Sequence, residues 1–165
     1  MELSASNGSG DGEFDLESIS LRSFSVEASS GDIAADAGGE QPLLEELTVD
    51  SSSGDVGLEL SGEYSSQVAL EVDLSGGDLT MDLSGGGWEE DLEGEVGLSS
   101  GTASITLPRE VGVYVEAETS SGEVDASGFR VDGEAYVNGA HGESDVTSNI
   151  SVGSSSGDVD LRLGD

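Results

Sequence analysis

Apolar residues alternate with polar or small residues along most of the chain, and the phrase Ser-Ser-Gly-Asp or a close variant interrupts this alternation at intervals. The clearest copy is Ser52-Ser53-Gly54-Asp55, with apolar residues at every second position on both sides of it. A period of two on both sides of a turn predicts two short strands, each with one buried face. No stretch of the chain has a helical period of comparable quality.

The phrase recurs at a nearly constant spacing. Its glycines are Gly31, Gly54, Gly77, Gly101, Gly122 and Gly157, with a degenerate copy around Gly142. The first intervals are 23, 23, 24 and 21 residues. Apolar residues stand five positions before each of the six clear glycines and two and four positions after it, as do Val49, Val56 and Leu58 around Gly54. A fixed period with a fixed register is typical of a stacked solenoid, in which each unit buries its apolar face against its neighbours.

We therefore predict an all-β fold with a single domain, a β-solenoid (β-helix) with coils of about 20 to 24 residues. An antiparallel β-roll or sandwich, in which each phrase forms a hairpin turn, stays open as the alternative. Residues 1–12 are rich in Ser, Gly and Asn and are predicted to form a flexible N-terminal tail, which leaves residues 13–165 as the repeat domain. In the turn, Gly supplies a positive φ angle, and Ser and Asp can bond the local backbone.

The composition adds an extreme acidity to this picture. The 165 residues include 36 acidic residues against four arginines and no lysine, which gives a formal net charge of −32. Such a field repels nucleic acid and anionic membranes. The regular apolar register argues against disorder, so we interpret the acidity as the surface of a salt-adapted, halophilic protein whose carboxylates are screened by salt. Cysteine is absent, which excludes disulfides and thiolate chemistry.

The chain contains no apolar run as long as a membrane span, and its first residues lack the basic start and apolar stretch of a signal peptide. We therefore expect no membrane insertion. The expected location is the cytoplasm by default, or the cell envelope or surface if a leader has been removed.

The acidic residue after the turn glycine is the main candidate for ligand chemistry. In a solenoid with coils about 4.8 Å apart, these residues would form a row along one edge, interrupted by Thr102: Asp32, Asp55, Asp78, Glu123 and Asp158. Stacked carboxylates repel each other, and a cation such as calcium would relieve the repulsion, so the row is a weak candidate for cation association. We favour the simpler interpretation that each acid bonds its own turn, because no EF-hand or nonapeptide calcium repeat is present. No catalytic residue and no cofactor are predicted.

Three other residues carry possible chemistry. Trp88 follows a run of three glycines and is predicted either as a contact anchor at a loop tip or as a plug folded over the edge of the core. His141 is the single histidine, and we expect it to be exposed and inert. Ser99 lies in a Gly-x-Ser-x-Gly sequence, but a strand is predicted after it where a nucleophile elbow requires a helix.

The pattern from Leu47-Thr48-Val49 through the turn to Val56-Gly57-Leu58 resembles the adhesin-like β-solenoid domains of bacteria and archaea. The segment 104–115, with Leu107-Pro108 between two strands and the turn Ser120-Ser121-Gly122-Glu123 after them, is similar to a segment of that family. The resemblance covers roughly Phe14 to Leu163. The function of that family is uncharacterised; the resemblance implies a scaffold associated with the cell surface or envelope, with an adhesive role as one expectation, and it offers no catalytic residues. With the acidity, it suggests a haloarchaeal or otherwise halophilic member.

We therefore predict a non-enzymatic structural or interaction scaffold that binds a protein or cell-surface partner. The alternative is a self-assembling scaffold similar to the bactofilins, because open solenoid ends can stack end to end. The segment from Gly139 to Ser148 matches the repeat poorly, and the unit that follows it in the sequence is the last one. This arrangement is a candidate cap, which argues against polymers. A third possibility is a carbohydrate-active enzyme on a β-helix, which abundant carboxylates allow but a scarcity of aromatic residues disfavours.

Overall fold

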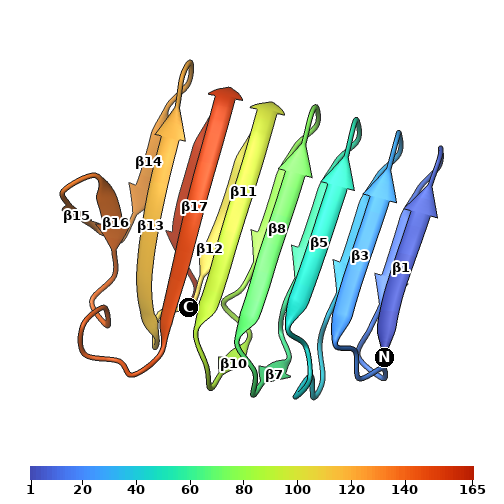
Figure 1. Cartoon of the computed structure of the whole chain (residues 1–165). Coiled ribbons are helices and arrows are strands. Elements are labelled where there is room, and N and C mark those ends of the chain that lie inside the picture. The colour runs from blue at the N-terminus through green and yellow to red at the C-terminus, as the bar shows by residue number, and fades with distance from the viewer.

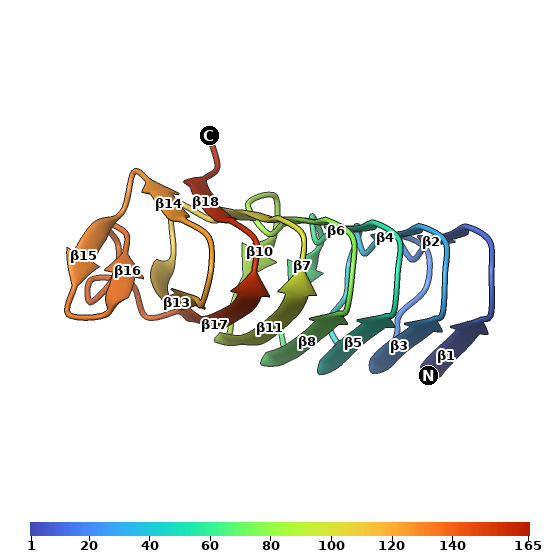
Figure 2. The same cartoon turned by 90° about the horizontal axis from the view of Figure 1, so that it is seen from above.

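The computed structural model describes all 165 residues and contains strands, turns and loops without a helix. The chain forms a two-sheet parallel β-solenoid: it passes from one sheet to the other through the Ser-Ser-Gly turns, and each coil stacks on a neighbour (Figures 1 and 2). Because neighbouring coils pair in parallel, the antiparallel roll or sandwich is excluded and the predicted fold class is confirmed. No segment is a helix with the length and apolar character needed to cross a membrane.

The larger sheet has nine strands. In spatial order they are β1 (Glu2–Asn7), β3 (Ser23–Ala28), β5 (Glu46–Ser51), β8 (Val68–Leu74), β11 (Leu92–Ser100), β17 (Thr147–Ser156), β13 (Gly112–Thr119), β16 (Ala135–Val137) and β15 (Arg130–Asp132). The facing sheet has seven strands in the order β2 (Gly12–Asp15), β4 (Ile33–Asp36), β6 (Val56–Glu59), β9 (Leu79–Asp82), β12 (Ala103–Leu107), β18 (Val159–Leu163) and β14 (Val124–Ser127). Two short strands, β7 (Glu63–Tyr64) and β10 (Gly87–Trp88), pair at the end of the coils opposite the Ser-Ser-Gly turns (Figure 1).

The strand pairs adopt the register that the sequence predicts. Val26, Val49, Val72, Val96 and Val152 are each other's partners along the nine-stranded sheet. The residues two positions after the glycine form a matching column in the facing sheet: Ile33, Val56, Leu79, Ala103, Val159 and Val124. The period of two therefore places equivalent apolar side chains on top of each other from coil to coil.

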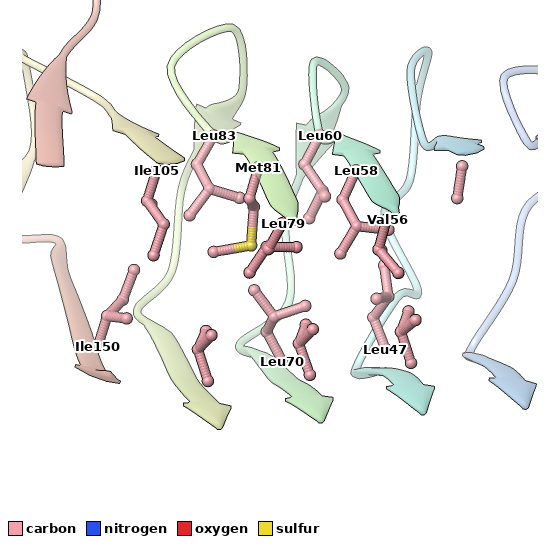
Figure 3. Close-up of a cluster of buried hydrophobic side chains, with 14 of the residues drawn as sticks. Leu47, Val56, Leu58, Leu60, Leu70, Leu79, Met81, Leu83, Ile105 and Ile150 are labelled. Carbon is pink, nitrogen blue, oxygen red and sulfur yellow. The ribbon is translucent and has the colours of Figure 1, made fainter. Parts of the chain in front are cut away.

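These columns meet between the sheets and form one continuous core. Figure 3 shows Leu47 and Leu70, from the nine-stranded sheet, facing Leu58 and Met81 of the other sheet. The buried cluster comprises 35 residues. Full burial of a side chain such as Leu or Val stabilises the fold by about 1.5 to 3 kcal/mol, so the stack is held mainly by this core and by the backbone ladders.

The structure corrects the prediction that residues 1–12 form a flexible tail. Glu2–Asn7 forms β1, which pairs in parallel with β3, and Gly12 already begins β2. The reason is the alternating burial of this strand: Leu3 and Ala5 are half-buried against the core, while Glu2, Ser4 and Ser6 are exposed. Although this segment is rich in Ser, it therefore contains the alternation of apolar and polar residues that is typical of a short strand.

At the C-terminal end of the solenoid, the coils do not stack in the order in which they occur in the sequence. The last coil in the chain, β17 and β18, lies between the coil of β11 and β12 and the coil of β13 and β14 (Figure 1). The apolar residues of this last coil are large and buried, as are Val152 and Leu161. The coil of β13 and β14 has Ala117 and Ala126 at comparable positions, and they are only half-buried. The inserted order thus places the more apolar coil inside the stack and the weaker one at its end.

The end of the stack is covered by a hairpin. Strands β15 and β16 pair antiparallel with each other, and β16 pairs antiparallel with β13. The predicted cap at Gly139 to Ser148 is therefore displaced: those residues form turns and the start of β17, and the residues just before them form the hairpin that covers the edge of β13.

Candidate functional site

The Ser-Ser-Gly-Asp turns form a column of glycines along the edge that is uppermost in Figure 1. Gly54 has a φ angle of 108°, and a Cβ atom at this position would lie 2.2 Å from the carbonyl oxygen of Gly31. The corresponding distance from Gly77 to the carbonyl oxygen of Gly54 is 2.1 Å. The glycine of each turn is thus required for two reasons: its backbone is left-handed, and the neighbouring coil approaches it closely.

The aspartate after the glycine bonds the neighbouring coil, which corrects the interpretation that each acid bonds its own turn. Oδ1 of Asp32 accepts a hydrogen bond from the backbone N–H of Asp55 at 2.9 Å, and Oδ1 of Asp55 accepts one from the N–H of Asp78 at 2.9 Å. The row begins at Asp11 and continues to the N–H of Thr102, which lies 2.8 Å from Oδ1 of Asp78. We call Asp11, Asp32, Asp55 and Asp78 the aspartate ladder.

The two remaining acids of the predicted row follow the inserted coil order. Gly157 packs on Gly101, so Asp158 belongs to the coil next to Thr102. Oδ1 of Asp158 accepts a hydrogen bond from the N–H of Glu123 at 2.9 Å. The structure therefore brings the predicted acids into one row, with Thr102 as the interruption and Glu123 at the end.

The carboxylates of the four aspartates in this row accept coil-to-coil hydrogen bonds, whereas Glu123 takes part in the row through its backbone N–H. All five of the predicted acids are exposed. No group of three or more His, Cys, Asp or Glu side chains is arranged to hold a metal ion. Weak cation association along the row stays a prediction.

Of the two roles predicted for Trp88, the structure excludes the contact anchor and favours the plug, because only 6% of this residue is exposed. Its ring stacks on Tyr64, with centroids 4.3 Å apart and planes inclined by 12°, and its Nε1 donates a hydrogen bond to the carbonyl oxygen of Leu83 at 3.1 Å. The Tyr64 hydroxyl donates to the carbonyl oxygen of Ala37, and burial raises the pKa of Tyr64. The two rings therefore plug the side of the core at β7 and β10.

Asn138 is a buried polar residue that the sequence does not reveal. Its Oδ1 accepts hydrogen bonds from the backbone N–H groups of Val113 and His141, each at 3.0 Å, and its Nδ2 donates to the carbonyl oxygen of Val111 at 2.8 Å. The side chain thus ties the segment after β16 to the start of β13. Its neighbours Val137 and Gly139 suggest only a turn, so no sequence signal predicts this junction.

The remaining candidates have structural surroundings. Ser99 lies in β11 and is followed by β12, so the strand-to-helix context of a nucleophile elbow is missing. His141 is half-buried where exposure was expected, with its ring centroid 5.7 Å from that of Tyr114, and its Nδ1 is buried without a hydrogen-bond partner.

A groove of about 670 Å³ crosses the outer face of the nine-stranded sheet. Its floor follows Leu70, Gly94 and Ile150, which are in register on β8, β11 and β17. The outward side chains on either side of this line form its two banks: Glu46, Ala69, Glu93, Asn149 and Tyr114 on one, and Thr48, Glu71, Glu95, Ser151 and Glu116 on the other. We call this feature the outer groove.

Five glutamates give the outer groove a strongly negative potential, and no basic residue lines it. Tyr114 is its single aromatic side chain, and its hydroxyl donates a hydrogen bond to Oε1 of Glu116 at 3.0 Å. This hydrogen bond and the negative charge of Glu116 raise the pKa of Tyr114. The rigid sheet below holds these groups in a fixed pattern, which suits recognition of a polar, positively charged surface.

Comparison with known proteins supports this architecture. A family model described as Toastrack DUF4097 matches residues 7–95, more than half of the chain. The crystal structure of a "putative cell adhesion protein" from Clostridium sporogenes is similar, with a TM-score of 0.50 and 18% sequence identity, over 99% of this chain and 92% of that chain. At this identity the likeness shows the fold alone. No curated protein matches the sequence.

Proposed function

Because the chain belongs to the Toastrack DUF4097 family, we propose that it is a non-enzymatic interaction scaffold with an adhesin-like role. The solenoid acts as a stiff body, and the outer groove is the surface that it presents. The observation that carries this proposal is the groove itself, in which five glutamates and Tyr114 are held on adjacent strands of one sheet.

The expected partner is a polar surface that carries positive charge, on a protein or on the cell surface. The groove runs across the strands, so its length follows the axis of the solenoid. An extended segment rich in Lys or Arg can contact both banks at once, and electrostatic complementarity would set its orientation and its rate of association.

The test is binding of immobilised protein to an array of lysine- and arginine-rich peptides and glycans. The double variant Glu71→Gln/Glu95→Gln removes two charges from one bank. The control Glu13→Gln/Glu59→Gln removes two charges from the opposite sheet, where these exposed residues lie on β2 and β6. We expect binding of cationic peptides to weaken several-fold in the groove variant only; equal losses in both variants, or no binding by the wild type, would refute the proposal.

A carbohydrate-active enzyme is less well supported. Such an enzyme commonly uses exposed aromatic rings to bind sugars, whereas Trp88 and Tyr64 are stacked inside the protein. A self-assembling filament similar to the bactofilins is less well supported because the β15–β16 hairpin covers one end of the larger sheet. Electron microscopy at high salt tests the filament directly, since discrete short particles contradict it.

We also propose that the protein is adapted to high salt. Only two ion pairs form, between Arg22 and Glu45 and between Arg162 and Asp160, although the chain has 36 acidic residues. The remaining carboxylates repel each other unless salt screens them. Circular dichroism during a salt titration tests this proposal: we expect loss of β-structure in dilute buffer, and an unchanged spectrum contradicts it.

A further inference from the structure

The two ends of the nine-stranded sheet differ in a way that bears on self-association. At one end lies β15, a fully exposed strand of three residues that includes Arg130 and Asp132. Short, charged edge strands protect a sheet from pairing with another chain. At the other end lies β1, a strand of six residues that contains neither Pro nor Lys and has Glu2 as its single charged side chain.

The free peptide groups of β1 belong to alternate residues. The carbonyl oxygen of Asn7 accepts a hydrogen bond from the N–H of Ser29 at 3.0 Å, on the side of β3. Peptide groups alternate along a parallel strand, so those of Leu3 and Ala5 also face β3. The N–H and C=O groups of Glu2, Ser4 and Ser6 therefore point away from the sheet, at its open edge.

We propose that a second copy of this chain pairs with β1 in antiparallel orientation, with the two-fold axis passing between the two Ser4 residues. Ser4 then forms a hydrogen-bonded pair with Ser4 of the other copy, and Glu2 forms one with Ser6 in both directions. On the core side, Leu3 lies opposite Ala5, so a large residue faces a small one. No carboxylate of β1 faces another carboxylate, which is the electrostatic condition for pairing in a chain with a net charge of −32.

The rest of this end sets the strength of the contact. The outward residues of β2 are Glu13 and Asp15, and in the dimer they approach their counterparts, so salt favours association by screening them. A strand of six residues is about 20 Å long and the two sheets are about 10 Å apart, which gives a contact face of roughly 200 Å² per copy. This is about a quarter of the area that each partner buries in a standard interface, so the dimer is expected to be weak and reversible.

The symmetry of this contact limits the assembly to two copies. A two-fold axis uses the same edge of both copies and leaves no second β1 edge free. The opposite ends carry the hairpin with the short, charged strand β15. This dimer therefore requires only the N-terminal edge, and it does not depend on the binding role proposed for the outer groove.

A cysteine pair tests the geometry, because the natural chain has no cysteine. In the variant Ser4→Cys the two Cα atoms would be about 5.5 Å apart, as in any hydrogen-bonded antiparallel pair, which suits a disulfide. The matched control is Ser25→Cys, because Ser25 is the partner of Ser4 on β3 and its two copies would be about 15 Å apart. We expect rapid oxidation of the first variant to a covalent dimer at high salt; equal rates in both variants, or a monomeric first variant, would overturn the proposal.

Sedimentation velocity provides a second measurement that needs no crosslink. The wild type and Ser4→Thr should show a dimer that grows with protein and salt concentration, and Ser4→Pro should remain monomeric because it removes an N–H at the open edge. Circular dichroism shows whether Ser4→Pro folds. A wild type that stays monomeric at high salt and high concentration, a folded Ser4→Pro that still dimerises, or species larger than a dimer would each contradict the inference.

Discussion

The aspartate ladder allows a prediction in which salt decides the outcome of a single substitution. Asp55 lies between Asp32 and Asp78, accepts the N–H of Asp78 through Oδ1, and donates its own N–H to Asp32. The substitution Asp55→Asn keeps an oxygen acceptor and removes the charge. Asp55→Ala removes both the charge and the acceptor, so the two variants separate the electrostatic and hydrogen-bond contributions.

The magnitudes follow from the spacing of the coils. Two unit charges about 4.8 Å apart repel by about 0.9 kcal/mol in water without salt. The Debye length is about 30 Å at 0.01 M salt and about 3 Å at 1 M. Repulsion from the two neighbours of Asp55 is therefore about 1.5 kcal/mol in dilute buffer and about 0.3 kcal/mol at 1 M. Loss of one hydrogen bond costs about 1 kcal/mol at either salt concentration.

We therefore expect Asp55→Asn to raise the free energy of unfolding by about 1 to 1.5 kcal/mol in dilute buffer and to be nearly neutral at 1 M salt. Asp55→Ala should be slightly stabilising in dilute buffer and destabilising by about 0.7 kcal/mol at 1 M salt. Urea unfolding followed by circular dichroism measures both. Asp145→Asn, in the loop before β17, is the control outside the ladder. A salt-independent effect of Asp55→Asn, or an equal effect of the control, would refute the reasoning.

Other predictions concern the turn, the core and one buried hydroxyl. Gly54→Ala should destabilise the fold by about 3 kcal/mol or more in thermal melts, because its Cβ would overlap Gly31 of the preceding coil. Gly153→Ala, where nothing lies within 4 Å, should be neutral or stabilising in the same measurement. Ser148→Ala should raise the melting temperature, since the Ser148 hydroxyl is buried without a partner, and a lower value contradicts this. Asn138→Ala should cost about 2 to 4 kcal/mol through the lost hydrogen bonds of its junction, and urea unfolding without a shift contradicts this. Burial raises the pKa of Tyr64, so its contribution to stability is present below about pH 10 and is lost at higher pH; absorbance at 295 nm should show one of the three tyrosines ionising only on unfolding.

The parts of the fold that the sequence predicts are those that repeat. Val49, Val56 and Leu58 recur in register with their glycine, and a side-chain period of two has one structural meaning when a turn follows it. The acids of the ladder are predicted to form a row for the same reason. Their hydrogen bonds to the next coil are not predicted, because an Asp beside a glycine bonds its own turn in most proteins.

The parts that were missed depend on comparisons between distant segments. The position of the last coil follows from the difference in side-chain size between Ala117 and Val152. These residues lie far apart in the sequence, so a local pattern of apolar positions does not compare them. Trp88 follows a glycine run that suits both a loop tip and a plug, and only its stacking on Tyr64 decides between them. The outer groove was missed because its floor is backbone at Gly94, where the only signal is one glycine in place of the apolar residue that other coils have.

The inserted coil has a consequence for the order in which the protein assembles during synthesis. The coils from β1 to β12 can stack one after another as they leave the ribosome, because each contacts the one before it. The coil of β13 and β14 emerges next, but its native neighbour is β17 and β18, which is made last. Until then the coil of β13 and β14 either stays undocked or pairs with β11 and is later displaced by β17. The coil of β13 and β14 and the hairpin therefore reach their native positions only after the final strands have been synthesised. A ribosome stalled before Thr147 would hold a stack in which this coil and the hairpin are not yet docked.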